Sequence, residues 1–539
     1  MALPERVRAS LPTVAAWALG VGGTLLVVGT LATAGRVGGA DAPHLVSTEI
    51  RLAQLVLDGE AGRALSLWWA LLAPQPPIGT LPGWILAVLT GGHPVFVHLC
   101  MVLVLLVACD GLLRLSTRLV GGPLAGAAAF LAFLSSPFTW ASVEQYSRDL
   151  VCAAAVVQAV AWAVGAVGLT ERRAAIGFGV WMGVAFGAKY TAPMFLLGPC
   201  VVLGVGILRR RSRAELRGLG LAVACFAGVA GVWYATHLRG VQGYLFTSMD
   251  PVAMADRTSS LRSPDTLAAR VYYAATAWEA LGAAGVALVA VGALLGLGRS
   301  GERRGIFLVL AGAIVGGVIL SRLPQQVDRY VLPGVLLATA LVIPLARWPL
   351  GWALVAIVVT PRLVASQQRF AAGQPGAAAT YEHPVSVLRE AHWPLPRGSW
   401  YPSDFSPKGW NLDAVVAAAR EAQGDEGTVG LLLPPGPLWP NFGHLAIPAA
   451  AQGARWDWAT VNLRGGGPMS PPYLMGPLFD GTWPSSAFTT LIAFEAPNAD
   501  PAVASWLSGR RLSMLARVDT GHGATAVIYR VGAAGGGTP

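Results

Sequence analysis

The sequence predicts a polytopic α-helical membrane protein with a soluble α/β domain at its C-terminal end. Of its 539 residues, 54 % are hydrophobic and only 12 % are charged, against roughly a quarter in soluble domains. Apolar segments approaching the roughly 20 residues that cross a bilayer recur through the first two thirds of the chain. Beyond residue 366 prolines are frequent and no such segment occurs. A water-soluble globular protein is therefore excluded.

Eleven segments are predicted to cross the membrane. They lie near residues 11–34, 94–113, 123–138, 149–169, 174–188, 192–208, 218–236, 271–297, 305–321, 330–346 and 348–365. Because the series continues so far along the chain, the first segment is interpreted as a span and not as a cleaved signal peptide. Residues 1–365 are therefore assigned to a transmembrane domain.

Arginine distribution predicts the orientation of these spans. Arginines cluster in the short loops on the side of the N-terminus, at residues 114–118, 172–173, 209–213, 303–304 and 347. An excess of basic residues marks cytoplasmic loops. We therefore predict a multi-pass protein of the inner (plasma) membrane with a cytoplasmic N-terminus. The opposite, extracytoplasmic side has three segments that are long or chemically rich: residues 35–92, a turn at 135–148, and residues 236–270. We expect the function on this side.

The net charge of +10 is explained by this topology, so no nucleic-acid partner is expected. Only two of the 38 basic residues are lysines, Lys189 and Lys408. A lysine retained against such a strong arginine bias suggests a need for a compact, mobile ammonium, for example to bind a phosphate.

The tail is predicted to form a separate extracytoplasmic α/β domain over residues 366–531, followed by a disordered segment at 532–539. Helical spacing occurs at residues 412–422 and 502–507, and strand patterns occur at 428–433, 488–494, 512–518 and 524–531. The tail contains no cysteine, so its stability must come from a packed core.

Ionisable residues at membrane depth are costly and mark functional sites by default. The first such cluster is Asp41-Ala-Pro-His44 followed by Glu49, directly after the first span. Asp41 could instead simply cap a helix that starts near Pro43. Carboxylate and imidazole groups in this cluster are also possible ligands for a divalent metal.

Two further clusters follow short apolar segments. Glu144, Tyr146, Arg148 and Asp149 come after a segment of about 15 apolar residues, and a helix of that length covers only roughly 22 Å of a core about 30 Å thick. Lys189-Tyr190 follows a second short segment, and Pro193 favours a break there. Two short spans that end on one side predict an outward-facing recess. The alternative for the lysine is an interfacial side chain that extends towards water.

The fourth cluster contains Asp328, Arg329 and Tyr330 at the start of the tenth span. An ion pair between the first two residues at the membrane interface is an alternative to a functional role here.

The order of these motifs resembles the C-type (GT-C) glycosyltransferase superfamily, in particular bacterial proteins similar to protein O-mannosyltransferases and lipid A aminoarabinose transferases. The resemblance covers about residues 11–346. It rests on Asp41, Pro76-Pro77, Tyr146 with Asp149, the stretch at 183–191 and Arg329-Tyr330 with Pro333. These families often have Asp-Glu after the first span, whereas Ala42 follows Asp41 in this sequence.

The resemblance implies transfer of a sugar from a polyprenyl-phosphate donor to a glycan, lipid or protein acceptor outside the membrane. Asp41 is then expected to be the catalytic base, with Asp149 in reserve, in a domain whose first outer loop is residues 35–92. Cations must offset the charge of the departing phosphate, and a carboxylate must accept the acceptor proton. The cations expected at the phosphate are Lys189, Arg329 and Arg148. The residues expected to contact the acceptor or order the loop are Glu144, Tyr146, Tyr190 and His44.

Two other functions remain open at this point. A transporter or flippase of a lipid-linked substrate would also have buried charges, although it predicts an internal symmetry that the sequence does not show. A non-catalytic scaffold with the same fold is the second alternative, and the alanine at position 42 is consistent with it.

Overall fold

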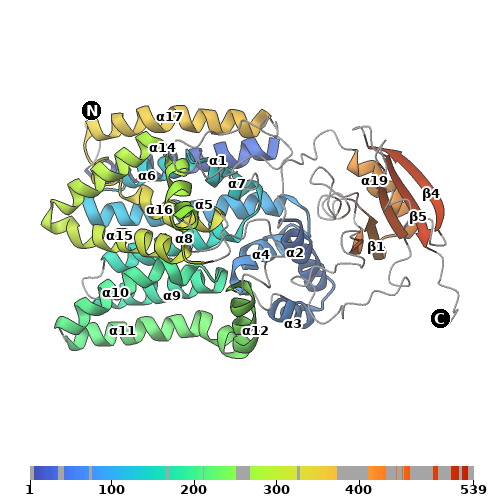
Figure 1. The fold of residues 1–539 in the computed structure, drawn as a ribbon, viewed down its shortest axis with the longest axis horizontal. Helices are drawn as coiled ribbons and strands as arrows, with labels where there is room; N and C mark the ends of the chain where they lie inside the picture. The colour runs from blue at the N-terminus through green and yellow to red at the C-terminus, as the bar shows by residue number, and fades with distance from the viewer. Residues whose placement is uncertain are drawn as a thin grey trace.

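The computed structural model has a large helical part and a small sheet domain (Figure 1). It describes residues 5–33, 42–71, 76–165, 169–210, 212–249, 267–323, 328–372, 411–432, 445, 449, 452, 454–461, 490–495, 512–520 and 525–531. The predicted helix at 502–507 and the predicted disordered end at 532–539 lie outside these residues.

The helical part begins with one long helix and a group of short ones that form most of the first predicted outer loop. These are α1 (Glu5–Thr33), α2 (Ala42–Leu57), α3 (Ala61–Leu71), the 3₁₀ helix η1 (Pro77–Thr80) and α4 (Leu81–Leu89). The central helices are α5 (Val95–Val120), α6 (Leu124–Leu134), α7 (Pro137–Glu144), α8 (Arg148–Gly165), α9 (Arg172–Ala188) and α10 (Ala192–Arg210). The last group is α11 (Arg213–Phe226), the π-helical turn η3 (Ala227–Gly231), α12 (Val232–Met249), α14 (Leu267–Leu297), α15 (Ser300–Leu320), η4 (Asp328–Val331), α16 (Leu332–Ala340) and α17 (Pro349–Ala372).

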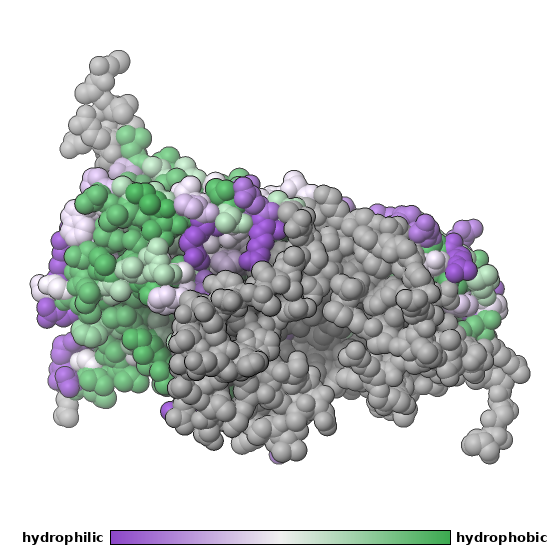
Figure 2. Space-filling view, turned by 45° about the horizontal axis from the view of Figure 1, so that its top comes forward, coloured by the Kyte–Doolittle hydropathy of each residue, from purple (hydrophilic) through white to green (hydrophobic). Residues whose placement is uncertain are grey.

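Eight helices in the described part of the chain are long and apolar enough to cross a bilayer, or nine spans if the bent pair α6 and α7 counts as one. Two further predicted spans correspond to α9 and α16, which have 17 and 9 residues and fall short of that length. All eleven predicted segments therefore contain helix, but eight or nine are full-length spans. Figure 2 shows hydrophobic residues over much of the visible side of the helical part, with hydrophilic residues at its end remote from the sheet domain.

Small residues let these helices approach closely, as is common where hydrocarbon surrounds a bundle. A Cβ atom on Gly179 of α9 would lie 2.2 Å from the carbonyl oxygen of Ala222 in α11. Gly198 of α10 makes an equally close approach to the carbonyl of Ala311 in α15. The core between the helices is one continuous hydrophobic cluster.

Two breaks in the helices differ from the prediction: one lies where a turn was predicted and the other lies within a span predicted to be continuous. The segment predicted as a turn at residues 135–148 contains α7, which meets α6 at 72°. Pro137 starts α7, because a proline is tolerated in the first turn of a helix but not in its interior. In α14, Gly282 has a left-handed φ of 68°, and Arg362 of α17 donates a hydrogen bond of 2.8 Å to the carbonyl of Ala280. The guanidinium thereby satisfies a carbonyl that the break releases.

The C-terminal domain is a five-stranded mixed sheet with one helix packed against it. Its elements are α19 (Leu412–Gln423), β1 (Glu426–Leu432), β2 (Arg455–Val461), β3 (Thr490–Glu495), β4 (Leu512–Asp519) and β5 (Thr525–Val531), in the sheet order β2-β1-β3-β5-β4. The first three of these strands pair in parallel, and β5 is antiparallel to both its neighbours. Val415 and Val416 of α19 pack with Ile492, Phe494 and Ile528 of the sheet.

The predicted helix at 412–422 and the four predicted strands match α19, β1, β3, β4 and β5. Strand β2 was not predicted, although its two tryptophans at alternating positions are a strand signal. The predicted domain boundary at residue 365 falls inside α17, which continues to Ala372.

Candidate functional site

Lys189 lies at the point where α9 ends. Its backbone is extended, with φ of −160° and ψ of 147°, so the helix stops at Ala188 and the lysine side chain leaves the helix axis. The Nζ atom donates a hydrogen bond to Oδ2 of Asp149 at 2.5 Å. The carboxylate is buried, with 1 % of its side chain exposed, whereas the lysine side chain is 20 % exposed. The ion pair therefore presents its cationic side towards solvent.

The first turn of α8 holds Asp149 in place. Its backbone N–H donates to Oγ of Ser147 at 3.1 Å, and the same hydroxyl donates to Oδ2 of Asp149 at 2.9 Å. A carboxylate in the first turn of a helix is stabilised by the helix dipole. Oδ2 of Asp149 thus accepts hydrogen bonds from both Ser147 and Lys189, and these two bonds fix the orientation of the carboxylate.

An aromatic ring supports the lysine from a third element. Nζ of Lys189 lies 4.7 Å from the ring centroid of Tyr330, within the range of a cation–π contact. Tyr330 belongs to η4, the short helix that also contains Asp328 and Arg329. The structure therefore brings together the third and fourth clusters predicted from the sequence, although the side chain of Arg329 lies outside the described part of the chain.

The first outer loop packs directly on this site through η1. A Cβ atom on Gly79 would lie 3.0 Å from Cδ of Arg148 and 3.1 Å from the carbonyl oxygen of Ala188, the residue before Lys189. On the other side, a Cβ atom on Gly187 would lie 2.2 Å from Ile78. Glycine at both positions lets the loop lie against the ends of α8 and α9.

A second buried pair links the loop to the turn before α8. The hydroxyl of Tyr146 donates to Oε2 of Glu49 in α2 at 2.7 Å, and both residues are almost fully buried. Burial raises the pKa of the Glu49 carboxyl well above its usual value, against the opposing effects of the Tyr146 hydrogen bond and the charge of Arg148. Burial likewise raises the pKa of Tyr146. Burial therefore favours the uncharged form of both side chains.

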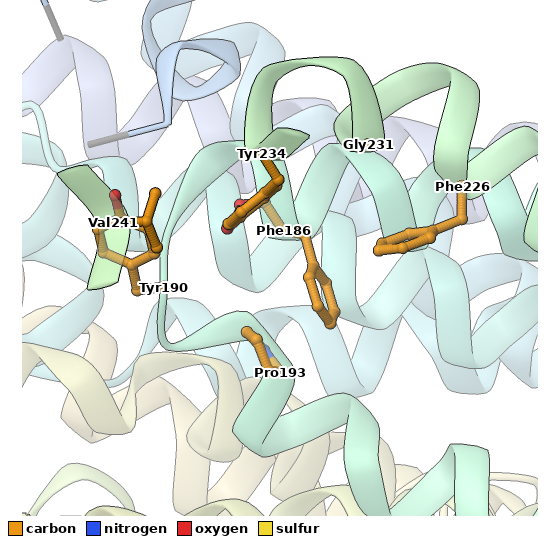
Figure 3. Close-up of a pocket in the computed structure, with 7 residues that line it drawn as sticks. All are labelled: Phe186, Tyr190, Pro193, Phe226, Gly231, Tyr234 and Val241. Atoms are coloured by element: carbon orange, nitrogen blue, oxygen red, sulfur yellow. The ribbon is translucent and has the colours of Figure 1, made fainter. Parts of the chain in front are cut away.

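An apolar cavity of about 250 Å³ lies beside the ion pair, between the end of α9, the start of α10 and the η3–α12 segment (Figure 3). It is lined by Phe186, Tyr190, Pro193, Phe226, Gly231, Tyr234 and Val241. Tyr190 follows Lys189 directly in the chain. The hydroxyl of Tyr234 donates to the carbonyl of Phe186 at 2.9 Å, which ties α12 to α9. In Figure 3 the rings of Phe186 and Tyr234 and the ring of Pro193 point into the space between these elements.

The remaining predicted residues are placed as follows. Glu144 is buried at the end of α7, and Arg148 is half-buried at the start of α8. His44 lies in the first turn of α2, but its side chain is outside the described residues, and Asp41 lies wholly outside them. Among the side chains that the structure describes, no three His, Cys, Asp or Glu groups gather as a metal site.

Two residues of the site were not singled out as partners in the sequence. Glu49 was named only as a member of the first ionisable cluster and a possible metal ligand. Its contact with Tyr146 spans 97 residues, which no local pattern reveals. Tyr330 was quoted only as part of a motif, and nothing in its local sequence indicates that its ring lies under Lys189.

No protein-family model and no curated protein matches the chain. Solved structures do match it in fold. ArnT from Cupriavidus metallidurans bound to undecaprenyl phosphate superposes with a TM-score of 0.57 at 14 % identity over 98 % of each chain. The apo state of the same protein gives a TM-score of 0.55 at 14 % identity, covering 96 % of this chain and 98 % of ArnT.

The arabinofuranosyltransferase AftD from Mycobacteria superposes with a TM-score of 0.53 at 17 % identity, over 99 % of this chain and 40 % of AftD. ArnT, a lipid A aminoarabinose transferase, and AftD are both GT-C glycosyltransferases. These likenesses agree with the resemblance noted in the motifs, and the chain has the GT-C fold.

Proposed function

We propose that this protein is a glycosyltransferase that moves a sugar from a polyprenyl-phosphate donor to an acceptor at the extracytoplasmic side of the membrane. The observation that carries this proposal is the Lys189–Asp149 pair beside an apolar cavity, in a chain with the GT-C fold. ArnT, with the same fold, is a protein whose structure contains undecaprenyl phosphate.

Lys189 is proposed to bind the donor phosphate. Its ammonium is partly exposed, and Asp149 and Tyr330 hold it in place. Arg148 precedes Asp149 in the same helical turn and adds a second cation, with Arg329 of η4 as a third. Cations fixed before the reaction stabilise charge that develops on a departing phosphate.

The cavity is proposed to hold the lipid side of the donor. Its lining is apolar and mainly aromatic, and it includes Tyr190, the residue that follows Lys189 in the chain. An amphiphile with a phosphate head and a hydrocarbon chain matches this juxtaposition of a cation and an apolar surface, whereas a free nucleotide sugar does not.

Asp41 is proposed to be the catalytic base. Asp149 is less suited to this role, because its Oδ2 already accepts hydrogen bonds from Lys189 and Ser147 and the side chain is buried. In the proposed reaction the acceptor hydroxyl oxygen attacks the anomeric carbon, the carboxylate of Asp41 takes the hydroxyl proton, and the bond to the phosphate oxygen breaks. The electron pair leaves with the polyprenyl phosphate, whose new charge lies beside Lys189.

The test uses the full-length protein reconstituted in vesicles with a synthetic polyprenyl-phosphate sugar and a mixture of envelope glycans, lipids and proteins. The proposal expects free polyprenyl phosphate and a glycosylated acceptor to appear together, measured by mass spectrometry. Lys189→Met should slow the appearance of both products. Arg63→Met, which removes an exposed cation of α3 in the first predicted outer loop, should not. Movement of intact donor between leaflets without cleavage would instead indicate a transporter, and neither movement nor cleavage would indicate a scaffold.

A further inference from the structure

The buried contact between Glu49 and Tyr146 joins two parts of the chain that the proposed reaction must keep together. Glu49 lies in α2, the first helix of the outer loop, and Tyr146 lies in the turn between α7 and α8. Their side chains are 1 % and 3 % exposed, and the phenol donates to the carboxyl oxygen at 2.7 Å. This is a specific polar contact inside an apolar environment, where a satisfied hydrogen bond holds its partners strongly.

A third helix closes over this pair. A Cβ atom on Gly83 of α4 would lie 1.9 Å from the hydroxyl of Tyr146 and 2.4 Å from Oε2 of Glu49. Glycine at that position lets the backbone of α4 lie directly against the hydrogen bond. No substrate can reach Glu49 through this contact, which argues against a role for its carboxyl as acid, base or ligand.

Tyr146 adopts a conformation that only a constrained turn maintains. Its φ is 49°, in the left-handed region that residues with a Cβ rarely occupy. Besides the bond to Glu49, its ring meets Phe96 of α5 edge to face, with centroids 6.3 Å apart. The side-chain contacts of Tyr146 therefore hold the turn whose next residues are Ser147, Arg148 and Asp149.

We propose that Glu49 is a positioning residue for the transferase site. Through Tyr146 it seats α2, the helix that follows Asp41 in the sequence, on the turn that carries Arg148 and Asp149, close to Lys189. This inference rests on the proposed function, because it assigns Asp41 and Lys189 to one reaction. Neither Glu49 nor Tyr146 touches the substrate in this account.

The decisive comparison is between variants that keep and variants that lose the acceptor oxygen. Glu49→Gln retains an oxygen for the Tyr146 hydroxyl, whereas Glu49→Ala and Tyr146→Phe each remove one side of the bond. Glu60→Gln, at an exposed carboxylate of the same loop, is the matched control. Because the alanine variant also leaves a hole, Tyr146→Phe, which removes only the hydroxyl, tests the inference independently.

Three quantities are measured on the full chain in vesicles: hydrogen exchange of the α2 amides, affinity for undecaprenyl phosphate, and turnover. We expect Tyr146→Phe and Glu49→Ala to speed exchange in α2 and to lower kcat on the order of tenfold or more. Donor affinity should fall less than kcat, because Lys189 itself stays paired with Asp149. Glu49→Gln and the control should stay near wild type, and the double variant should be no worse than the worse single variant.

Unchanged α2 exchange in Tyr146→Phe would overturn the inference. So would a loss in Glu49→Gln as large as in Glu49→Ala, because the negative charge and not the hydrogen bond would then matter. Failure of the proposed function would look different: wild-type protein would release no polyprenyl phosphate, whereas α2 exchange would still report whether Glu49 seats the loop.

Discussion

Lys189 and Asp149 are 40 residues apart in the chain, yet the ammonium and carboxylate are 2.5 Å apart where α8 begins and α9 ends. The buried carboxylate compensates the charge of the ammonium, while the lysine side chain stays 20 % exposed. A pair of this kind keeps a cation ready inside a largely apolar protein without leaving it unpaired before the donor arrives.

The first prediction concerns Asp149→Asn. This change leaves Lys189 next to a neutral amide, and removing one partner of a buried ion pair typically costs about 3–5 kcal/mol. We expect a clearly lower Tm in detergent and weaker donor binding, while Glu60→Gln, at an exposed pair, should change the Tm little. If Asp149→Asn kept its stability but lost all chemistry while Asp41→Asn remained active, the two carboxylates would exchange roles.

The second prediction concerns the proposed base. Asp41→Asn keeps the size of the side chain and removes its ability to accept a proton, so turnover should fall on the order of a hundredfold or more. Affinity for polyprenyl phosphate should be nearly unchanged, because the donor phosphate lies at Lys189 in this account. Steady-state kinetics together with donor titration separates the two effects. Full activity of a correctly inserted Asn variant would remove Asp41 from the mechanism.

The third prediction follows from the pKa of Glu49, which burial raises well above 4.5. Between pH 4.5 and its folded pKa, Glu49 keeps a proton in the folded state that it releases in the unfolded chain. Its contribution to the free energy of unfolding is therefore largest below pH 4.5. Its contribution falls as the pH rises from 4.5 towards the folded pKa. The other groups that face it are Tyr146, Arg148 and Cys100.

The measurement is the Tm of wild type and of Glu49→Gln over a pH series. Because glutamine does not titrate, the variant should gain stability relative to wild type as the pH rises above 4.5. Parallel Tm curves over the whole series would contradict the prediction, because they would show that Glu49 has the same pKa in the folded and unfolded states.

The fourth prediction concerns the C-terminal domain, which we propose is extracytoplasmic and helps to hold the acceptor. Because α17 continues to Ala372, a truncation should be made after that residue and not near 365. The shortened protein should bind undecaprenyl phosphate as wild type does and transfer sugar poorly to its native acceptor. Loss of donor binding in a stably inserted truncation, or cytoplasmic labelling of a cysteine placed near residue 465, would contradict the proposal.

The sequence predicted local structure better than contacts. Apolar segment length predicted the helices, because hydrocarbon demands continuous hydrogen-bonded backbone. The short segment that ends at residue 188, together with Pro193, correctly indicated the break at Lys189 between α9 and α10. The span count was less accurate, since α9 and α16 are too short to be counted by length.

Contacts between distant residues were beyond prediction from one sequence. The Lys189–Asp149 and Glu49–Tyr146 pairs depend on how α2, α8 and α9 pack. The left-handed φ of Tyr146 has no local signal, because glycine is the residue that such a conformation normally favours. The break in α14 is similar: one glycine within a long apolar run is common, and only the guanidinium of Arg362 shows why the helix opens there.

The most direct test of the central claim is the affinity of the reconstituted protein for undecaprenyl phosphate, measured by titration for wild type, Lys189→Met and Arg63→Met. Both variants remove one positive charge and keep an aliphatic chain, but only the first lies at the proposed phosphate site. The account predicts at least a tenfold weaker affinity, about 1.4 kcal/mol, for Lys189→Met and no change for Arg63→Met. Equal affinity in all three proteins would contradict it.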